Sequence, residues 1–473
     1  MTAIPELQAA IGSPQTAAAK PQLERRLGAL DGTLLTIGAI IGTGIFLTTS
    51  DIARGLPQPA WILAVWVVGG LLTLAGALTY AELGAMYPDA GGIYLFLREA
   101  YGPLAGFLYG WAAFFVIMSG GIAALAVGFG EYLGSFLPFF STRHELWALP
   151  LAGWVWRVNG GQLAGVLAIL LLTAINYAGL RQGAAVQNLM TVLKIGAIAL
   201  FVVGGFLVRS NVAVEWTAPL PHLPRGLLAA FGVGMIAALW TYDGWYGLTF
   251  SAGELKNPAR SLPLGLIYGV AATVAMYALI NLAYLRAIPV AAMGDTTRIG
   301  EAAAAVLFGG GASRWLSAAI VISTFGCLAS TILYSARIYL PMAEDGYFFR
   351  AVGRVHPSHH TPGVSLWTQS LWAVLLTLSG TYEQLYTYVV FAGVLFHAAT
   401  GAAVFVLRRT LPARPRPYRT WGYPWVPAAF ILASLVLLGN TLLERPTESL
   451  LGLGLVALGL PAYLYWRRTA ARR

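Results

Sequence analysis

Two long apolar stretches of the chain are interrupted by residues that disfavour a helix. The first interruption lies in Ile40-Ile-Gly-Thr-Gly-Ile-Phe46 and the second in Leu239-Trp-Thr-Tyr-Asp-Gly-Trp245. Glycine weakens a helix, and aspartate caps a helix better than it continues one. Each break would leave free C=O groups at the end of one half-helix and free N–H groups at the start of the next. The C=O groups suit an ammonium and the N–H groups suit a carboxylate, so two such breaks can bind a small zwitterion with few charged side chains.

Three side chains stand beside these breaks. Trp240 precedes the second break and is placed to cover a ligand, although an ordinary packed aromatic fits equally well. Thr43 is placed to cap the second half of the first helix. Asp243 is an ionisable group at membrane depth, which makes it a functional candidate, but its position directly before Gly244 favours a capping role. For Gly42 and Gly44 the alternative is a close helix-packing seam.

Lys194 lies in the middle of another apolar stretch, Met190-Thr-Val-Leu-Lys194-Ile-Gly-Ala. A lysine at the centre of a bilayer is costly and is usually functional. It can donate hydrogen bonds to the carbonyls of a broken helix, taking the place of a sodium ion. Alternatively, it can lose its proton during transport.

The composition of the chain as a whole indicates a membrane protein. It is 58% hydrophobic and 10% charged, with a mean hydropathy of +0.70, whereas soluble domains are about one quarter charged. A spanning helix needs roughly 20 apolar residues. By this measure we expect twelve spans, at 33–54, 60–85, 103–137, 161–180, 187–208, 225–252, 263–287, 314–340, 364–380, 385–407, 424–442 and 448–466.

The distribution of charge predicts the orientation. The net charge is +10, and most loop Lys and Arg residues fall on the side of the predicted bundle that holds both ends of the chain. By the positive-inside rule both termini are cytoplasmic in a cell (inner) membrane. Residues 1–26 are expected to form a cytoplasmic tail. We expect no nucleic acid, because the positive charge is mostly loop Arg, as the positive-inside rule predicts. We expect no metal site, because the chain has one cysteine and because His356, His359 and His360 fall in a Pro-rich basic loop that is more typical of a solvated cytoplasmic segment. The sequence has no nucleotide-binding loop, and we expect no cofactor.

Several motifs resemble one family. Ile40 to Phe46 resembles the first-helix motif of the amino acid–polyamine–organocation superfamily. The segment Tyr80-Ala-Glu-Leu-Gly-Ala-Met-Tyr-Pro-Asp-Ala-Gly-Gly-Ile-Tyr94, followed by Glu99-Ala-Tyr-Gly-Pro103, is similar to its second-helix signature. Thr241-Tyr-Asp-Gly-Trp245, with Gly253-Glu-Leu-Lys-Asn-Pro258, resembles the sixth-helix signature of the L-type amino acid transporter branch.

The resemblance implies an all-α membrane protein with twelve transmembrane helices. Helices one to five (residues 27–210) and six to ten (222–410) would form an inverted repeat of five plus five, with helices one and six discontinuous. The last two helices, in 411–473, would be peripheral.

The resemblance also implies a set of site residues. The substrate-binding residues would be Ile41, Gly42, Thr43, Gly44 and Ile45 on the first helix and Trp240, Thr241, Tyr242 and Gly244 on the sixth. Trp240 would be the gate, and Lys194 would be the fifth-helix sodium substitute. Trp at 240 and Asp at 243 depart from the commonest choices in the animal members, which bears on side-chain preference. The loop at 141–160 lacks the cysteine that links animal members to a partner subunit, so no disulfide-linked partner is expected.

The leading hypothesis is therefore a sodium-independent transporter that exchanges neutral L-amino acids by alternating access. The alternatives are a proton-coupled amino acid symporter and a polyamine or cationic amino acid permease. An amino acid sensor on the same fold would normally bring a signalling domain. An intramembrane enzyme would need a cluster of polar catalytic groups at depth, and the spans hold almost none beyond Lys194 and Asp243.

Overall fold

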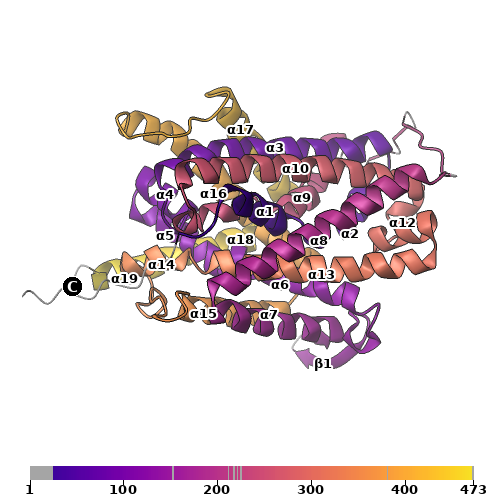
Figure 1. Ribbon diagram of the computed structural model, residues 1–473, viewed down its shortest axis with the longest axis horizontal. Helices are drawn as coiled ribbons and strands as arrows, with labels where there is room; N and C mark the ends of the chain where they lie inside the picture. The colour runs from indigo at the N-terminus through magenta and orange to yellow at the C-terminus, as the bar shows by residue number, and fades with distance from the viewer. Residues whose placement is uncertain are drawn as a thin grey trace, which may run out of the picture.

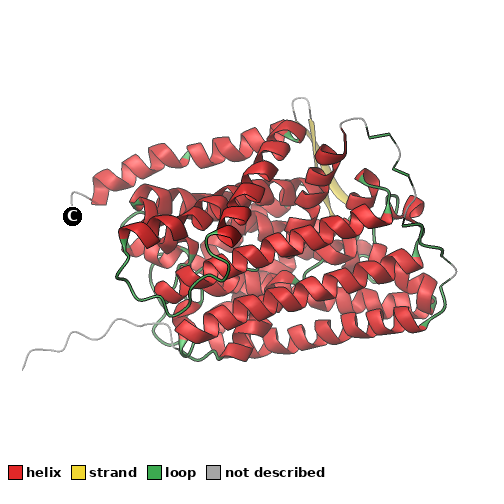
Figure 2. Cartoon of the chain, turned by 90° about the horizontal axis from the view of Figure 1, so that it is seen from above, coloured by secondary structure: helices red, strands yellow, loops and turns green. Residues whose placement is uncertain are grey.

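The computed structural model describes residues 25–151, 154–210, 212–216, 219–220, 222–223, 226–380 and 382–470. This part of the chain is a bundle of helices with one short β-hairpin at its margin (Figures 1 and 2). The long helices run roughly along the longest axis of the molecule (Figure 1). The predicted tail at 1–26 lies outside the described residues, except for its last two.

The first half of the chain forms eight α-helices, a π-helical turn, a short 3₁₀ turn and a hairpin. In order they are α1 (Ala29–Ile40), α2 (Gly44–Gly55), α3 (Pro59–Met86), α4 (Ile93–Tyr101), α5 (Pro103–Ala112), η1 (Ala113–Ile117), α6 (Met118–Leu133), η2 (Pro138–Phe140), β1 (Glu145–Leu151), β2 (Trp154–Asn159), α7 (Gly160–Ala178) and α8 (Leu180–Leu207).

The second half contains the remaining helices. They are α9 (Gly226–Tyr242), η3 (Gly247–Thr249), η4 (Ala252–Glu254), α10 (Pro258–Ala287), α11 (Val290–Met293), α12 (Ile299–Phe308), α13 (Gly310–Ser335), α14 (Tyr339–Glu344), α15 (Gly363–Thr377), α16 (Tyr382–Thr410), α17 (Trp425–Glu444), α18 (Pro446–Ala457) and α19 (Gly459–Ala470).

The number of helices that can cross a bilayer unaided is smaller than twelve. Among the described residues, nine continuous helical stretches are long and apolar enough, and the bent pair α1–α2 makes a tenth. The other two expected spans are represented by shorter helices, α9 with 17 residues and α15 with 15. The chain is thus a multi-pass membrane protein, and the count of twelve stays a prediction.

Both predicted interruptions are present, but they differ in form. At the first, α1 and α2 meet at an angle of 44° across three residues. At the second, α9 ends at Tyr242 and is followed by turns and the short 3₁₀ pieces η3 and η4, without a second regular half-helix. The sequence had indicated one span over 225–252 with an α-helical half on each side of the break.

The hairpin β1–β2 was not expected from the sequence. Its strands pair antiparallel between α6 and α7, with Leu151 opposite Trp154 at the turn end and Glu145 opposite Asn159 at the base. The rings of Trp147 and Trp156 meet edge to face across the strands.

Helix packing brings the two breaks together in the middle of the bundle. Helix α10 packs along both α3 and α1, α2 packs against α9, and α13 packs against α6 and α8. In Figure 1, α3 and α10 run side by side along one face of the bundle, and α8 crosses in front of it. The interrupted segments are therefore surrounded by continuous helices.

Candidate functional site

The carbonyl end of α1 is held by a lysine from a distant helix. The amino group of Lys194 on α8 donates to the carbonyl oxygens of Gly38 at 3.0 Å and Ile41 at 2.7 Å. The hydroxyl of Ser323 on α13 also donates to the Ile41 oxygen, at 3.3 Å. Lys194 is only 2% exposed. Since the C-terminus of a helix carries a partial negative charge, this is a favourable position for a cation.

The carbonyls of Ala39 and Ile40, which lie between Gly38 and Ile41, also have side-chain donors. The thiol of Cys327 on α13 donates to the Ala39 oxygen at 3.0 Å. The hydroxyl of Tyr277 on α10 lies 3.2 Å from the Ile40 oxygen and 3.1 Å from the Thr241 oxygen at the end of α9. Four consecutive carbonyls at the first break thus have side-chain donors within reach from α8, α10 and α13, and the single hydroxyl proton of Tyr277 is shared between the two breaks.

Glycines allow the two breaks to touch. A Cβ on Gly44 would lie 2.6 Å from the Thr241 hydroxyl oxygen and 3.0 Å from its Cα. Gly244 has φ of +89°, and a Cβ there would lie 2.8 Å from the Ala39 carbonyl oxygen. The hydroxyls of Thr48 on α2 and Thr241 are hydrogen-bonded at 2.8 Å. Larger residues would separate the two interrupted segments.

A small cavity lies where the breaks meet, and we call it the central pocket. Its volume is about 30 Å³, whereas one water molecule needs roughly 10–15 Å³. The central pocket is lined by Ala39, Ile40, Gly42 and Gly44 at the first break, by Trp240, Thr241, Asp243 and Gly244 at the second, by Ile117, Met118, Gly121 and Leu125 on the η1–α6 segment, and by Cys327, Thr331 and Tyr334 on α13.

One wall of the central pocket contains an irregular helical turn. Residues 113–117 form the π-helical turn η1 between α5 and α6, and Ile117 is its last residue. Single π-turns inside α-helices often occur at functional sites. The turn falls within a uniformly apolar run, Trp111-Ala-Ala-Phe-Phe-Val-Ile-Met118, so the sequence offers no signal that would have located it.

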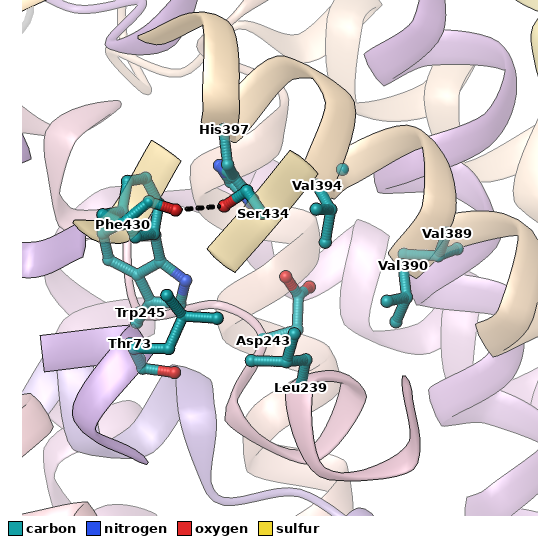
Figure 3. Close-up of a pocket in the computed structure, with 12 residues that line it drawn as sticks. Thr73, Leu239, Asp243, Trp245, Val389, Val390, Val394, His397, Phe430 and Ser434 are labelled. Atoms are coloured by element: carbon teal, nitrogen blue, oxygen red, sulfur yellow. Dashed lines mark hydrogen bonds between the residues drawn. The ribbon is translucent and has the colours of Figure 1, made fainter. Parts of the chain in front are cut away.

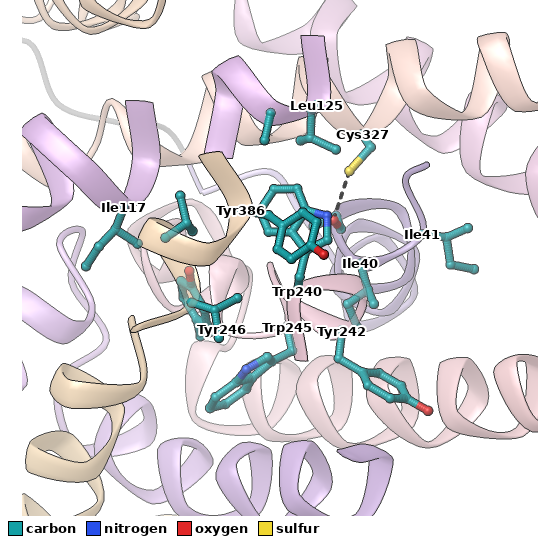
Figure 4. Packing of buried hydrophobic residues seen from close by; sticks show 14 of the residues in the cluster. Ile40, Ile41, Ile117, Leu125, Trp240, Tyr242, Trp245, Tyr246, Cys327 and Tyr386 are labelled. Carbon is teal, nitrogen blue, oxygen red and sulfur yellow. Dashed lines mark hydrogen bonds between the residues drawn. The ribbon is translucent and has the colours of Figure 1, made fainter. Parts of the chain in front are cut away.

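Trp240 stacks on a second aromatic ring. Its indole lies 5.8 Å from the ring of Tyr386 on α16, with an interplanar angle of 18° (Figure 4). The Tyr386 hydroxyl donates to Asp51 on α2 at 3.3 Å. The pair therefore connects the second break to α2 and α16, and sequence reasoning did not single out Tyr386.

The central pocket gathers some of the predicted substrate-binding residues but not all. Gly42, Gly44, Trp240, Thr241 and Gly244 line it, whereas Ile41, Thr43, Ile45 and Tyr242 do not.

Two of the residues that do not line the central pocket are Tyr242 and Thr43, and the structure shows the surroundings of each. The Tyr242 hydroxyl donates to the Trp66 oxygen at 3.1 Å, and its ring points away from Trp240 (Figure 4). Thr43 is the N-cap residue of α2, but its side chain makes no capping hydrogen bond, so the predicted cap is wrong. Its backbone is already near-helical there, with φ of −78° and ψ of −24°, whereas a capping residue usually has an extended backbone.

The predicted capping role of Asp243 is also wrong. The next helical piece, η3, begins after Tyr246, which is its N-cap residue. The Asp243 carboxylate accepts a long hydrogen bond, 3.4 Å, from the Tyr246 hydroxyl. It borders the central pocket on one side and a second cavity on the other.

This second cavity, which we call the rear cavity, also has a volume of about 30 Å³. It is lined by Leu72 and Thr73 on α3, Leu239, Asp243 and Trp245 around the second break, Val389, Val390, Gly393, Val394 and His397 on α16, and Phe430 and Ser434 on α17 (Figure 3). His397 is buried, and its Nδ1 is hydrogen-bonded to the Tyr80 hydroxyl at 2.7 Å.

The chain segment before α1 is tied to the segment after the second break. The N–H groups of Arg26 and Leu27 donate to the Glu254 oxygen at 2.8 and 2.9 Å, and the N–H of Lys256 donates to the Leu27 oxygen at 2.7 Å. The Glu254 carboxylate forms a fully buried ion pair with Arg337, at 2.6 Å. Together these contacts close the bundle at the α1 end.

The loop histidines do not form a metal site in the described part of the chain, where no three His, Cys, Asp or Glu side chains are grouped to hold an ion. His356 and His359 instead pack around the ring of Tyr177.

Comparison with known proteins gives consistent matches along most of the chain. The family described as amino acid permease matches residues 27–450. The serine/threonine exchanger SteT of Bacillus subtilis is 31% identical over 455 residues, covering 95% of this chain and 98% of that protein. The b(0,+)-type amino acid transporter 1 of Mus musculus is 28% identical over 435 residues, covering 90% and 84%. The large neutral amino acids transporter small subunit 2 of Mus musculus is 29% identical over 473 residues, covering 98% and 84%.

Proposed function

The chain belongs to the amino acid permease family, and from this premise we propose that it exchanges neutral L-amino acids across the membrane by alternating access, without sodium. It is a membrane transporter of amino acids and not an enzyme. The proposal adds the substrate class, the ion independence and the exchange mode. A relative named as a serine/threonine exchanger supports both the neutral class and exchange.

The position of Lys194 is the observation that carries the sodium-independent reading. A sodium ion bound at a broken helix is coordinated largely by carbonyl oxygens. Here the Lys194 amino group reaches the Gly38 and Ile41 oxygens, so a side chain supplies the positive charge at the end of α1. We assign Lys194 the role of sodium substitute.

The two breaks supply complementary groups for a zwitterion. The start of α2, at Gly44 and Ile45, presents N–H groups and the positive end of a helix dipole, which suit the substrate carboxylate. The carbonyls at the end of α9, around Trp240 and Thr241, suit the ammonium. The proposed substrate site therefore comprises Ile41, Gly42, Thr43, Gly44 and Ile45 at the first break and Trp240, Thr241, Tyr242 and Gly244 at the second.

The size of the central pocket implies that substrate entry requires movement. At about 30 Å³, it has room for roughly two water molecules, which is less than an amino acid occupies. The Trp240–Tyr386 stack stands at its wall and joins α9 to α16. We assign Trp240 the role of gate, opening when this stack separates.

The orientation and architecture follow from the same proposal. We place both termini in the cytoplasm of a cell with the protein in its inner membrane, because the basic loops lie on that side. The repeats would comprise residues 27–210 and 222–410, followed by peripheral helices in 411–473. We expect no disulfide-linked partner subunit, since the segment between α6 and α7 contains no cysteine.

Reconstitution into liposomes tests this function. Uptake of labelled alanine, serine or leucine should require unlabelled amino acid inside, and should persist when choline replaces sodium. If none of these amino acids enters while polyamines do, the substrate class is wrong. If uptake needs no internal amino acid but stops when the proton gradient is removed, the protein is a proton symporter and not an exchanger.

A further inference from the structure

Among the residues that the structure describes, Asp243 is the one that borders both the central pocket and the rear cavity. Its carboxylate points into the space between α9, α16 and α17 (Figure 3). In the part of the chain that the structure describes, no Lys, Arg or His lies within ion-pair distance of it. Lys194, on α8, is instead engaged with the carbonyls of α1.

A carboxylate in this position lacks a partner for its charge. Its side chain accepts hydrogen bonds from the Gly244 N–H and, over a long 3.4 Å, from the Tyr246 hydroxyl, and both donors are neutral. An ionised carboxylate away from bulk water is costly unless it is paired, and otherwise it takes up a proton. The residue is therefore stable in two forms, protonated or beside a cation.

The rear cavity can receive a proton released by Asp243. At about 30 Å³, it can hold roughly two water molecules. Opposite Asp243 its wall includes His397, whose Nδ1 is bound to Tyr80 and whose Nε2 lies on the side of Gly393. Thr73 and Ser434 also line the cavity; their hydroxyls donate to the Gly69 and Phe430 oxygens, and each hydroxyl oxygen can still accept a hydrogen bond. Imidazole and hydroxyl groups around water are suitable for relaying a proton.

We propose that Asp243 exchanges a proton for the ammonium group of the substrate, and that the proton leaves through the rear cavity. This inference rests on the proposed function, since it takes a zwitterion in the central pocket as the incoming cation. When the substrate binds, the O–H bond of Asp243 breaks and its electron pair stays on the carboxylate. The proton passes to water in the rear cavity and then to solvent, while the carboxylate pairs with the substrate ammonium. Charge and atoms balance without any redox step.

Other titratable groups surround Asp243, and experiments must distinguish proton release by Asp243 from proton release by these groups. They are Tyr246 on its own segment, Tyr109 on α5, Cys327 and Tyr334 on α13, His397 on α16 with its partner Tyr80 on α3, and Lys194 on α8 beyond Cys327.

Calorimetric titration of the purified full-length protein with alanine tests the proposal. Repeating the titration in buffers of different ionisation enthalpy counts the protons released on binding. Close to one proton per alanine should be released at pH values where the free protein holds the proton, and there the affinity should rise by up to about tenfold per pH unit. The sign follows because a ligand that displaces a proton binds better as protons become scarce.

Variants identify the group that releases the proton. In Asp243→Asn, proton release and the pH dependence of affinity should both disappear. Glu145→Gln, on the hairpin, removes a carboxylate from an exposed ion pair with Arg157 and should release as many protons as the native protein. If Asp243→Asn still releases a proton on binding, the proton comes from another group, such as Lys194, and the proposal is wrong. If Asp243→Asn fails to fold, the native protein decides, because binding without proton release overturns the proposal by itself.

A filled rear cavity tests the route. Gly393→Val places side-chain atoms in the rear cavity, and a Cβ there meets His397 at an ordinary 3.7 Å. With a pH indicator in stopped flow, this variant should release the same number of protons more slowly. An unchanged rate would mean that the proton leaves by the central pocket. If no neutral amino acid binds to the native protein at all, it is the proposed function that fails.

Discussion

The two helix breaks look alike in sequence, but they are stabilised in different ways. At the first, side chains from α8, α10 and α13 donate to four consecutive carbonyls, those of Gly38, Ala39, Ile40 and Ile41. At the second, α9 gives way to turns, and the Asp243 carboxylate faces two cavities and accepts from neighbours on its own segment, the Gly244 N–H and, at 3.4 Å, the Tyr246 hydroxyl.

This difference indicates which of the two breaks can change its conformation during transport. Buried carbonyls that are all satisfied resist movement, because breaking their bonds leaves polar groups unpaired. The carbonyls of Trp240 and Gly244 at the second break are instead satisfied by N–H groups of the same segment, those of Asp243 and Gly247, so that segment can rearrange while breaking fewer bonds from other helices. We therefore expect the first break to stay as a fixed binding edge while the second break responds to the substrate.

The largest effect is expected from removing the main donor at the first break. Lys194→Ala leaves the Gly38 oxygen without its donor and the Ile41 oxygen with only Ser323, and each unsatisfied buried acceptor costs about 1–3 kcal/mol. It also removes the positive charge proposed to replace sodium. Uptake of labelled alanine into proteoliposomes should be abolished while the protein still inserts, as checked by size-exclusion chromatography.

Lys256→Ala is the matched control for that change. Lys256 lies just after η4 with an exposed side chain, and its truncation should leave uptake unchanged. If Lys194→Ala transports normally, Lys194 has no part in the mechanism and the contrast between the two breaks loses its main support.

A smaller but clear effect is expected where the two breaks touch. Gly244→Ala places a side chain on a residue with φ of +89° and pushes its Cβ to 2.8 Å from the Ala39 oxygen. The backbone strain alone is about 1–2 kcal/mol, and the collision separates the breaks. Uptake should fall by about tenfold or more.

Gly226→Ala isolates the strain from the collision. Gly226 has φ of +80° and nothing within 4 Å of its added Cβ. This variant should lose some thermal stability and keep its uptake. Equal losses of uptake in both variants would show that contact between the breaks is unimportant.

The smallest effect is expected at the second break, from a change of Trp240. Trp240→Leu removes the stack on Tyr386, and such pairs contribute about 0.5–1.5 kcal/mol. Larger amino acids should then compete with labelled alanine roughly two- to tenfold better. Trp315→Leu, which changes a tryptophan that is 79% exposed on α13, should leave the competition profile unaltered, and an unaltered profile in Trp240→Leu would remove the gate assignment.

The sequence located the breaks and Lys194 because their signals are local. Glycine pairs and an aspartate inside apolar runs are visible without any knowledge of packing, and so is a lysine at bilayer depth. The other donors could not be found in this way. Tyr277 and Cys327 are isolated polar groups in apolar helices, and their contacts with Ile40 and Ala39 depend on how α10 and α13 pack around α1.

The two wrong capping predictions have different causes. Capping rules assume that a regular helix follows the break, and after Asp243 no such helix forms. After Thr43 the regular helix α2 does form, but the backbone of Thr43 is already near-helical and its side chain makes no capping hydrogen bond. The sequence also gave no indication of the π-helical turn at 113–117 or of the hairpin between α6 and α7, since the first lies in a uniform apolar run and the second in a segment read as a loop.

The thiol of Cys327 has a practical consequence. It is the single cysteine of the chain, it lines the central pocket, and it is hydrogen-bonded to the Ala39 oxygen. A thiol-reactive label added to the native protein therefore has one target, which lies at the centre of the transport route. The rate of labelling reports how often the pocket opens, and protection by an amino acid reports its occupancy, without any engineered cysteine.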